Sequence, residues 1–133
     1  VATGSPFDPV LLDGQTHRIG QGNNVYIFPG VGLGAIVVEA RHVTNRMFTV
    51  AAETLAARVT GDDLAAGSLY PRLSELRALT RDIARAVAKE AMRAGDAPVI
   101  DDDALERRLD DTIWTPSYPD YAPAGSSPRS ALV

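Results

Sequence analysis

A glycine-rich polar segment, residues 20–24 (Gly-Gln-Gly-Asn-Asn), carries side chains that could bind a small molecule. The amides of Asn23 and Asn24 each offer hydrogen-bond donors and an acceptor without carrying a charge. Such groups suit the recognition of a carboxylate or a hydroxyl group. The same residues also fit a plain turn, because glycine and asparagine enter left-handed backbone conformations easily. On residue types alone, the turn is the favoured interpretation.

A second glycine pattern, residues 30–35 (Gly-Val-Gly-Leu-Gly-Ala), matches the relaxed spacing of a dinucleotide-binding loop. That motif requires a second strand ending in an acidic residue about 20 positions later. The residues that follow have helical periodicity instead, and Pro29 occupies the place of the tight first turn. We therefore expect these glycines to allow a helix to pack closely on a sheet.

The acidic and histidine residues show no catalytic or metal-binding spacing. Residues 101–103 are three aspartates, with Asp110 and Asp111 nearby, but no calcium-loop pattern connects them. Carboxylates are favourable at the amino end of a helix, which is the role predicted here. His17 and His42 lie near no recognisable nucleophile motif, so both are expected to be structural or surface residues.

The periodicity of apolar residues predicts the elements that position these groups. The predicted strands are a strand end at residues 1–3, a hairpin over residues 10–19 that turns at Asp13-Gly14, and a buried strand at residues 25–28. The predicted helices lie at residues 32–43, 44–59 and 73–94, with a short helix after Thr60 and a last helix after residue 103. Thr44 is the expected N-cap of the second helix, and the spacing of Thr60 and Asp63 indicates a capping box. Only one strand leads into a helix, and a buried strand needs parallel neighbours on both sides. The chain also begins with Val1, so we expect it to be part of a larger α/β domain.

Composition excludes several classes of function. The chain has 133 residues, a formal net charge of −4 and no cysteine. Disulfide scaffolds, thiol catalysis and cysteine-based zinc sites are therefore excluded. The acidic balance argues against nucleic acid as a partner, and no apolar run is long enough for a membrane span. After Trp114 the chain is rich in proline and serine. We expect an extended tail that Trp114, Tyr118 and Tyr121 anchor on a protein surface.

Residues 20–30 (GQGNNVYIFPG) resemble, almost letter for letter, the glycine–asparagine segment of the large-type malic enzymes. Other matching stretches follow in the same order: residues 2–7 (ATGSPF), residues 41–48 (RHVTNRMF), residues 69–73 (LYPRL), and Trp114 with Tyr118. Arg72 departs from the family pattern, which has a second proline there. The resemblance covers roughly residues 1 to 121 and is much more specific than a single glycine motif.

This resemblance implies a fold class and a domain organisation. The chain would be an incomplete, C-terminal piece of a doubly wound, Rossmann-like NAD-binding domain, followed by a helical C-terminal region. Residues 1–60 would hold the last strands and helices of the NAD-binding domain. Residues 61–114 would form the helical region, which helps to build subunit contacts in homodimers or homotetramers. Residues 115–133 would be the tail.

The resemblance also implies an activity: oxidative decarboxylation of (S)-malate to pyruvate and CO₂ with NAD or NADP and Mn²⁺ or Mg²⁺. Asn23 and Asn24 match the asparagine pair that contacts malate, while Ser5, Pro6 and Gly22 match segments near the cofactor. The catalytic and metal-binding residues of the family match nothing in this chain, so the piece alone is expected to be inactive. A cytoplasmic location is expected.

Two alternatives belong to other classes of protein. The chain could be a free-standing, non-catalytic helical interaction or binding domain, which would melt cooperatively as a monomer. It could also be a dehydrogenase of the amino-acid type, which shares the doubly wound architecture. The order of the asparagine loop, the Tyr-Pro turn and the tryptophan segment argues against that second alternative.

Overall fold

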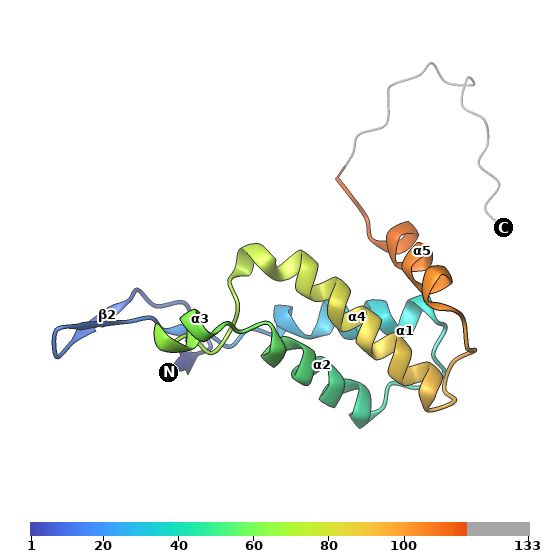
Figure 1. Cartoon of the computed structure of the whole chain (residues 1–133), viewed down its shortest axis with the longest axis horizontal. Coiled ribbons are helices and arrows are strands. Elements are labelled where there is room, and N and C mark those ends of the chain that lie inside the picture. The colour runs from blue at the N-terminus through green and yellow to red at the C-terminus, as the bar shows by residue number, and fades with distance from the viewer. Residues whose placement is uncertain (117–133) are drawn as a thin grey trace, which may run out of the picture.

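The computed structural model describes residues 1–116, in which short strands precede a group of helices (Figure 1). The strands are β1 (Ala2–Thr3), β2 (Val10–Leu12), β3 (Gln15–His17) and β4 (Gly20–Gln21). The α-helices are α1 (Phe28–Val37), α2 (Asn45–Ala57), α3 (Gly61–Ala65), α4 (Leu76–Arg93) and α5 (Asp102–Thr112), and the 3₁₀ helices are η1 (Asn24–Tyr26) and η2 (Leu73–Glu75). The predicted anchoring by Tyr118 and Tyr121 lies outside the described residues.

The strands form two separate pairs. β1 and β4 are parallel, with Ala2 opposite Gly20 and Thr3 opposite Gln21. β2 and β3 form the predicted hairpin, closed by Asp13 and Gly14. Both turn residues have positive φ angles, 50° and 75°, which is why the Asp-Gly pair suits this two-residue connection. The hairpin extends away from the helices in Figure 1.

The predicted strand at residues 25–28 is wrong. This segment contains the last two residues of η1 and the start of α1. The Asn23 side chain caps η1 by accepting a hydrogen bond from the Val25 backbone N–H, and Pro29 lies in the first turn of α1. Proline is favourable there because its missing N–H has no partner within the helix in any case. The parallel partner of β1 is β4, which the sequence prediction had assigned to a loop.

The core lies where α4 crosses α1 and α2, and these two contacts are the most extensive between elements. In Figure 1, α4 runs between α1 and α2, with α5 at the far end from the hairpin. Most side chains of the core are apolar and come from these four helices: Val31, Val37, Met47, Ala51, Leu55, Leu79, Ile83, Ala84, Val87, Ala88, Ala91, Leu105 and Leu109. Burial of this continuous apolar surface is the main force that holds the helices together.

Gly30 and Gly34 allow α1 to approach α4 closely. A Cβ atom on Gly30 would lie 2.5 Å from the Ile83 side chain, and one on Gly34 would lie 2.5 Å from the Ala84 carbonyl oxygen. The predicted close packing therefore exists, but its partner is helix α4 and not a sheet. Since α4 occupies the space beside these glycines, they cannot cradle a dinucleotide phosphate.

Local capping signals are confirmed at the start of two helices, whereas the bounds predicted for a third helix are wrong. The Thr44 hydroxyl accepts a hydrogen bond from the Met47 N–H at the start of α2. Thr60 and Asp63 form the predicted capping box of α3. The helix predicted at residues 32–43 instead begins at Phe28 and ends at Val37, because the chain turns through Glu39 with a positive φ of 53°.

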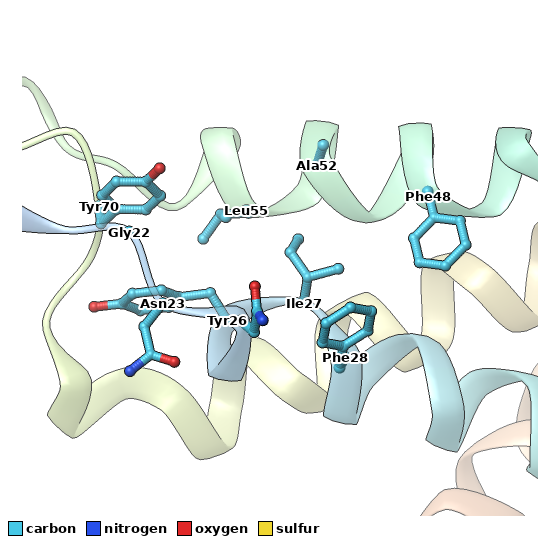
Figure 2. Close-up of a pocket in the computed structure, with 10 residues that line it drawn as sticks. Gly22, Asn23, Tyr26, Ile27, Phe28, Phe48, Ala52, Leu55 and Tyr70 are labelled. Atoms are coloured by element: carbon cyan, nitrogen blue, oxygen red, sulfur yellow. The ribbon is translucent and has the colours of Figure 1, made fainter. Parts of the chain in front are cut away.

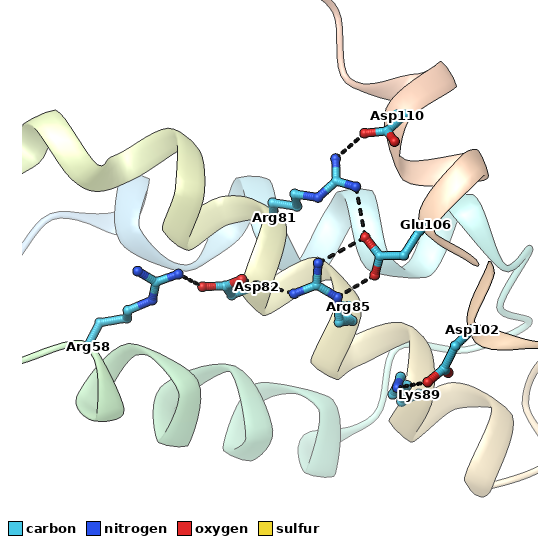
Figure 3. Close-up of polar contacts among 8 residues, drawn as sticks. All are labelled: Arg58, Arg81, Asp82, Arg85, Lys89, Asp102, Glu106 and Asp110. Atoms are coloured by element: carbon cyan, nitrogen blue, oxygen red, sulfur yellow. Dashed lines mark hydrogen bonds and ion pairs between the residues drawn. The ribbon is translucent and has the colours of Figure 1, made fainter. Parts of the chain in front are cut away.

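Ion pairs join the solvent-facing sides of three helices (Figure 3). Arg58 at the end of α2 pairs with Asp82 of α4, and Asp82 also accepts from Arg85 at 3.0 Å. Arg81 and Arg85 both donate to Glu106 of α5, with Nη2–Oε2 distances of 2.8 and 2.9 Å respectively. These bonds lower the pKa of Glu106 to about 2, so it is ionised at neutral pH.

Two of the three aspartates at the start of α5 have partners within residues 1–116. Asp101 accepts from the Ala104 N–H at 2.7 Å and so caps the helix. Asp102 pairs with Lys89 at 2.8 Å. Among residues 1–116, no helix is both long and apolar enough to cross a membrane.

Candidate functional site

The candidate binding residues follow the carboxyl ends of β1 and β4. Because the two strands are parallel, the segments after them lie at one edge of the pair. The Gly22 N–H donates to the Thr3 carbonyl at 2.8 Å, and the Gln21 side chain donates to the Gly4 carbonyl at 3.2 Å. These bonds fix where the chain leaves β4 and enters the asparagine segment.

An open pocket of about 390 Å³ lies between this segment and α2. Figure 2 shows Phe48, Ala52 and Leu55 of α2 on one side and the chain leading into α1 on the other. The lining residues from the chain before and within α1 are Gly22, Asn23, Asn24, Tyr26, Ile27 and Phe28, and Tyr70 closes one end. The site therefore has an apolar wall facing a short polar segment.

Three of the predicted site residues, Gly22, Asn23 and Asn24, are brought together in this pocket. The Asn23 side-chain oxygen accepts from the Val25 N–H at 3.0 Å, which fixes its orientation. Asn24 is exposed, and no hydrogen bond engages its side-chain amide within residues 1–116. The pocket thus contains one oriented amide and one amide that is available to a ligand.

Ser5 and Pro6 lie at the same edge but outside the pocket lining. Both residues are exposed, and the Ser5 carbonyl accepts from the Thr3 hydroxyl at 2.6 Å. This bond tightens the turn after β1. The structure therefore separates these two predicted residues from Gly22 and the asparagines.

Tyr26 and Tyr70 are pocket residues that the sequence prediction missed. Their rings stack with centroids 5.4 Å apart and an interplanar angle of 14°. The Tyr26 hydroxyl donates to the Pro71 carbonyl at 2.9 Å. Burial, and to a lesser extent the neighbouring Tyr70, raises the pKa of the Tyr26 phenol, so it remains a neutral donor. The buried hydrogen bond and the stack connect the asparagine segment to the turn before η2.

The described residues contain no group of three or more His, Cys, Asp or Glu side chains that could hold a metal ion. His42 lies 2.9 Å from Asp96, on an exposed surface away from the pocket. His17 belongs to the β2–β3 hairpin. A substrate in the pocket would therefore meet neutral amides, aromatic rings and aliphatic side chains.

The parallel strand pair, the amide-bearing segment at its carboxyl edge and the helix that follows are typical of ligand-binding α/β domains. Residues 1–92 match the family described as malic enzyme, NAD binding domain, and the chain belongs to the malic enzyme family.

Curated relatives give the same result. The chain is 45% identical over 121 residues to the NAD-dependent malic enzymes of Idiomarina loihiensis and Vibrio parahaemolyticus, and 43% identical to that of Aliivibrio fischeri. Each alignment covers 91% of this chain but 22% of the relative. The chain thus spans about a fifth of the length of the relatives it matches.

Proposed function

We propose that this chain supplies the malate-facing asparagine segment of an NAD-dependent malic enzyme. The complete polypeptide would oxidise and decarboxylate (S)-malate to pyruvate and CO₂. The relatives are named NAD-dependent, which favours NAD over NADP as the cofactor. The proposal rests on one observation: Asn23 and Asn24 lie side by side in the sequence, at the rim of a pocket at the carboxyl edge of a parallel strand pair.

The chemistry of the amides supports a positioning role toward malate. An Asn24 N–H can donate to a substrate carboxylate, and its oxygen can accept from the substrate hydroxyl. Neither interaction changes the charge of the site, and the bond from the Asn24 N–H to the carboxylate can persist after oxidation, when the hydroxyl has become a carbonyl and no longer donates. Correct orientation of a bound substrate is itself a large part of catalysis.

The chain's own residues fit the edge of a nicotinamide site, and they do not fit a phosphate cradle. Gly30 and Gly34 are packed against α4, whereas the neutral amides of Asn23 and Asn24 could contact a carboxamide or a carboxylate. In the complete reaction NAD supplies the hydride acceptor, and Mn²⁺ or Mg²⁺ supplies the charge that stabilises the enolate. We propose that the metal ligands, the acid and the base lie in other parts of the polypeptide.

Exposed apolar side chains support a role in assembly. Val1, Phe7, Leu11 and Trp114 have between 62% and 78% of their surface exposed. Surfaces of this kind favour contact with further parts of the polypeptide or with another subunit. We propose that the family's homodimer or homotetramer covers part of this surface, and that residues 1–133 alone are catalytically inactive.

A chimeric enzyme tests the substrate role of Asn24. In it, this chain replaces the matching segment of the Idiomarina loihiensis malic enzyme, to which it is 45% identical. We expect the Asn24→Ala substitution to raise the KM for malate and to lower kcat/KM more than about tenfold, since a hydrogen bond to a charged group is worth about 1.5–3 kcal/mol.

Asn45→Ala is the matched control, because Asn45 is an exposed asparagine at the first position of α2. We expect this variant to keep the parent kinetics. If the Asn24 and Asn45 variants have equal malate kinetics, the proposed substrate role of Asn24 is refuted. Malate-dependent NADH formation by residues 1–133 alone would contradict the predicted inactivity of the piece.

A further inference from the structure

A second, smaller pocket adjoins the first one at the Tyr26–Tyr70 stack. Its volume is about 220 Å³, and both tyrosines line it as well as the asparagine pocket. Arg18, which follows β3, and Arg72, which precedes η2, are the charged residues of its lining. Gln21 and Ser68 are the uncharged polar residues of the lining besides the two tyrosines. Two segments 54 residues apart therefore place positive charge around one small cavity.

The charge of this pocket is opposite to that of the whole chain. The chain has a formal net charge of −4, yet this lining contains two guanidinium groups and no carboxylate. Arg58, Arg81 and Arg85 all have carboxylate partners. Within residues 1–116, no such ion pair involves Arg18 or Arg72. Their charges are thus available to an anion from solution.

Asp63 is a carboxylate whose pKa both arginines help to lower. Hydrogen bonds from Thr60 are the main cause of its lowered pKa, and Arg72 and Arg18 add to the effect. Its Oδ2 accepts from the Thr60 hydroxyl at 2.6 Å and from the Thr60 N–H at 3.2 Å. Because the capping box engages this oxygen, Asp63 remains at the start of α3 and outside the pocket lining.

We propose that this pocket binds a small dianion, a phosphate or a short dicarboxylate, between Arg18 and Arg72. Guanidinium groups form paired, charge-assisted hydrogen bonds with both kinds of oxyanion. A dianion would balance the two positive charges of the lining, and the small cavity favours a small ligand. Arg72 stands where the family resemblance has a second proline, so one of the two charges comes from a residue that distinguishes this chain.

The position of the pocket links its occupancy to the asparagine segment. Gly20 and Gln21 line the dianion pocket, and the next residues along the chain, Gly22 to Asn24, line the other pocket. A ligand that holds Arg72 would also fix the adjoining turn, where Pro71 accepts the Tyr26 hydrogen bond. A regulatory effect on malate binding rests on the proposed function, whereas dianion binding does not.

Binding is measured with sodium phosphate and sodium succinate as separate probes, at constant ionic strength, by amide NMR shifts of the 133-residue chain and by calorimetry on the chimeric enzyme. We expect saturable shifts at residues 20–24 with at least one probe. Arg18→Gln and Arg72→Gln should each weaken binding about tenfold or more, since each removes charge-assisted hydrogen bonds. The probe that binds more tightly identifies the class of dianion.

Arg107→Gln is the matched control, because Arg107 is an exposed arginine on α5, away from the pocket. It removes the same charge and should leave the affinity within about twofold of the parent value. The proposal is overturned if neither probe gives saturable shifts, or if all three variants weaken binding equally, which would indicate general charge attraction. Loss of malate turnover in the chimera would contradict the proposed function without affecting the measured dianion affinity.

Discussion

Replacing Gly34 by alanine should destabilise the fold, because α1 and α4 touch at that position. An alanine Cβ would lie 2.5 Å from the Ala84 carbonyl oxygen and 2.8 Å from the Val87 Cβ. The nearest atom belongs to the backbone of α4, so no side-chain rotation relieves the contact. The two helices would have to move apart along their most extensive contact.

The magnitude follows from two opposing effects. Overpacking in a well-packed core costs about 1–3 kcal/mol, and a backbone contact places this site at the upper end of that range. The higher helix propensity of alanine relative to glycine stabilises the helix by about 1 kcal/mol. The net loss in the free energy of unfolding should be about 2 kcal/mol, or a fall in Tm of roughly 6–8 °C for a domain of this size.

The assay is urea or thermal unfolding followed by far-ultraviolet circular dichroism. Gly32→Ala provides a control in the same helix, because nothing lies within 4 Å of a Cβ at that position. It should gain up to about 1 kcal/mol from helix propensity alone. If the Gly34 variant is as stable as the Gly32 variant, the close packing of α1 on α4 is refuted.

Two further predictions concern the ion pairs and the tyrosine stack. Since Arg85 and Arg81 lower the pKa of Glu106 from its ordinary 4.5 to about 2, its contribution to stability is fully present above pH 4.5 and is lost as the pH falls toward 2. In urea unfolding measured across this pH range, Glu106→Gln should therefore flatten the pH dependence of the free energy of unfolding. The Glu106 side chain is 36% exposed, so the loss of stability at pH 7 should be only about 1 kcal/mol. An unchanged pH profile would contradict the ion-pair network in Figure 3. Tyr26→Phe should cost about 1 kcal/mol in chemical denaturation, because it leaves the Pro71 carbonyl without its buried partner; a variant as stable as the parent would show that this bond contributes nothing.

Signals that act within a few residues were predicted correctly from the sequence. The Asp13-Gly14 hairpin, the Thr44 cap and the capping box of Thr60 with Asp63 each depend on one turn of chain. Their residue types satisfy backbone groups that would otherwise be unpaired at the ends of an element. The surrounding fold has little influence on them.

The error at residues 25–28 has a physical origin. A short run of β-branched and aromatic residues fits a buried strand and a buried helix start equally well. Two flanking residues favour the helix. The Asn23 side chain caps the helical turn η1, and Pro29 is tolerated in the first turn of α1. Pro29 was interpreted as the end of a strand instead of the beginning of α1.

The candidate site was predicted in part. Gly22, Asn23 and Asn24 are adjacent in the sequence, so their shared pocket follows directly from local chain geometry. The Tyr26–Tyr70 stack joins residues 44 positions apart, and Phe48 comes from a different helix. Such contacts depend on how α2 and the Tyr70 turn pack, which one sequence does not specify.

The contact between α1 and α4 also determines which movements of the helices can shift Asn23 and Asn24. Asn24 lies only a few residues before α1, and α1 cannot slide along α4 while Gly30 and Gly34 are held against it. The two helices should therefore move as one rigid body, and α5 is joined to α4 by the hydrogen bonds from Arg81 and Arg85 to Glu106. A small rotation of α5 would be transmitted through α4 and α1 to the segment that carries Asn24, so a contact made by α5 would shift the residue that we propose faces malate.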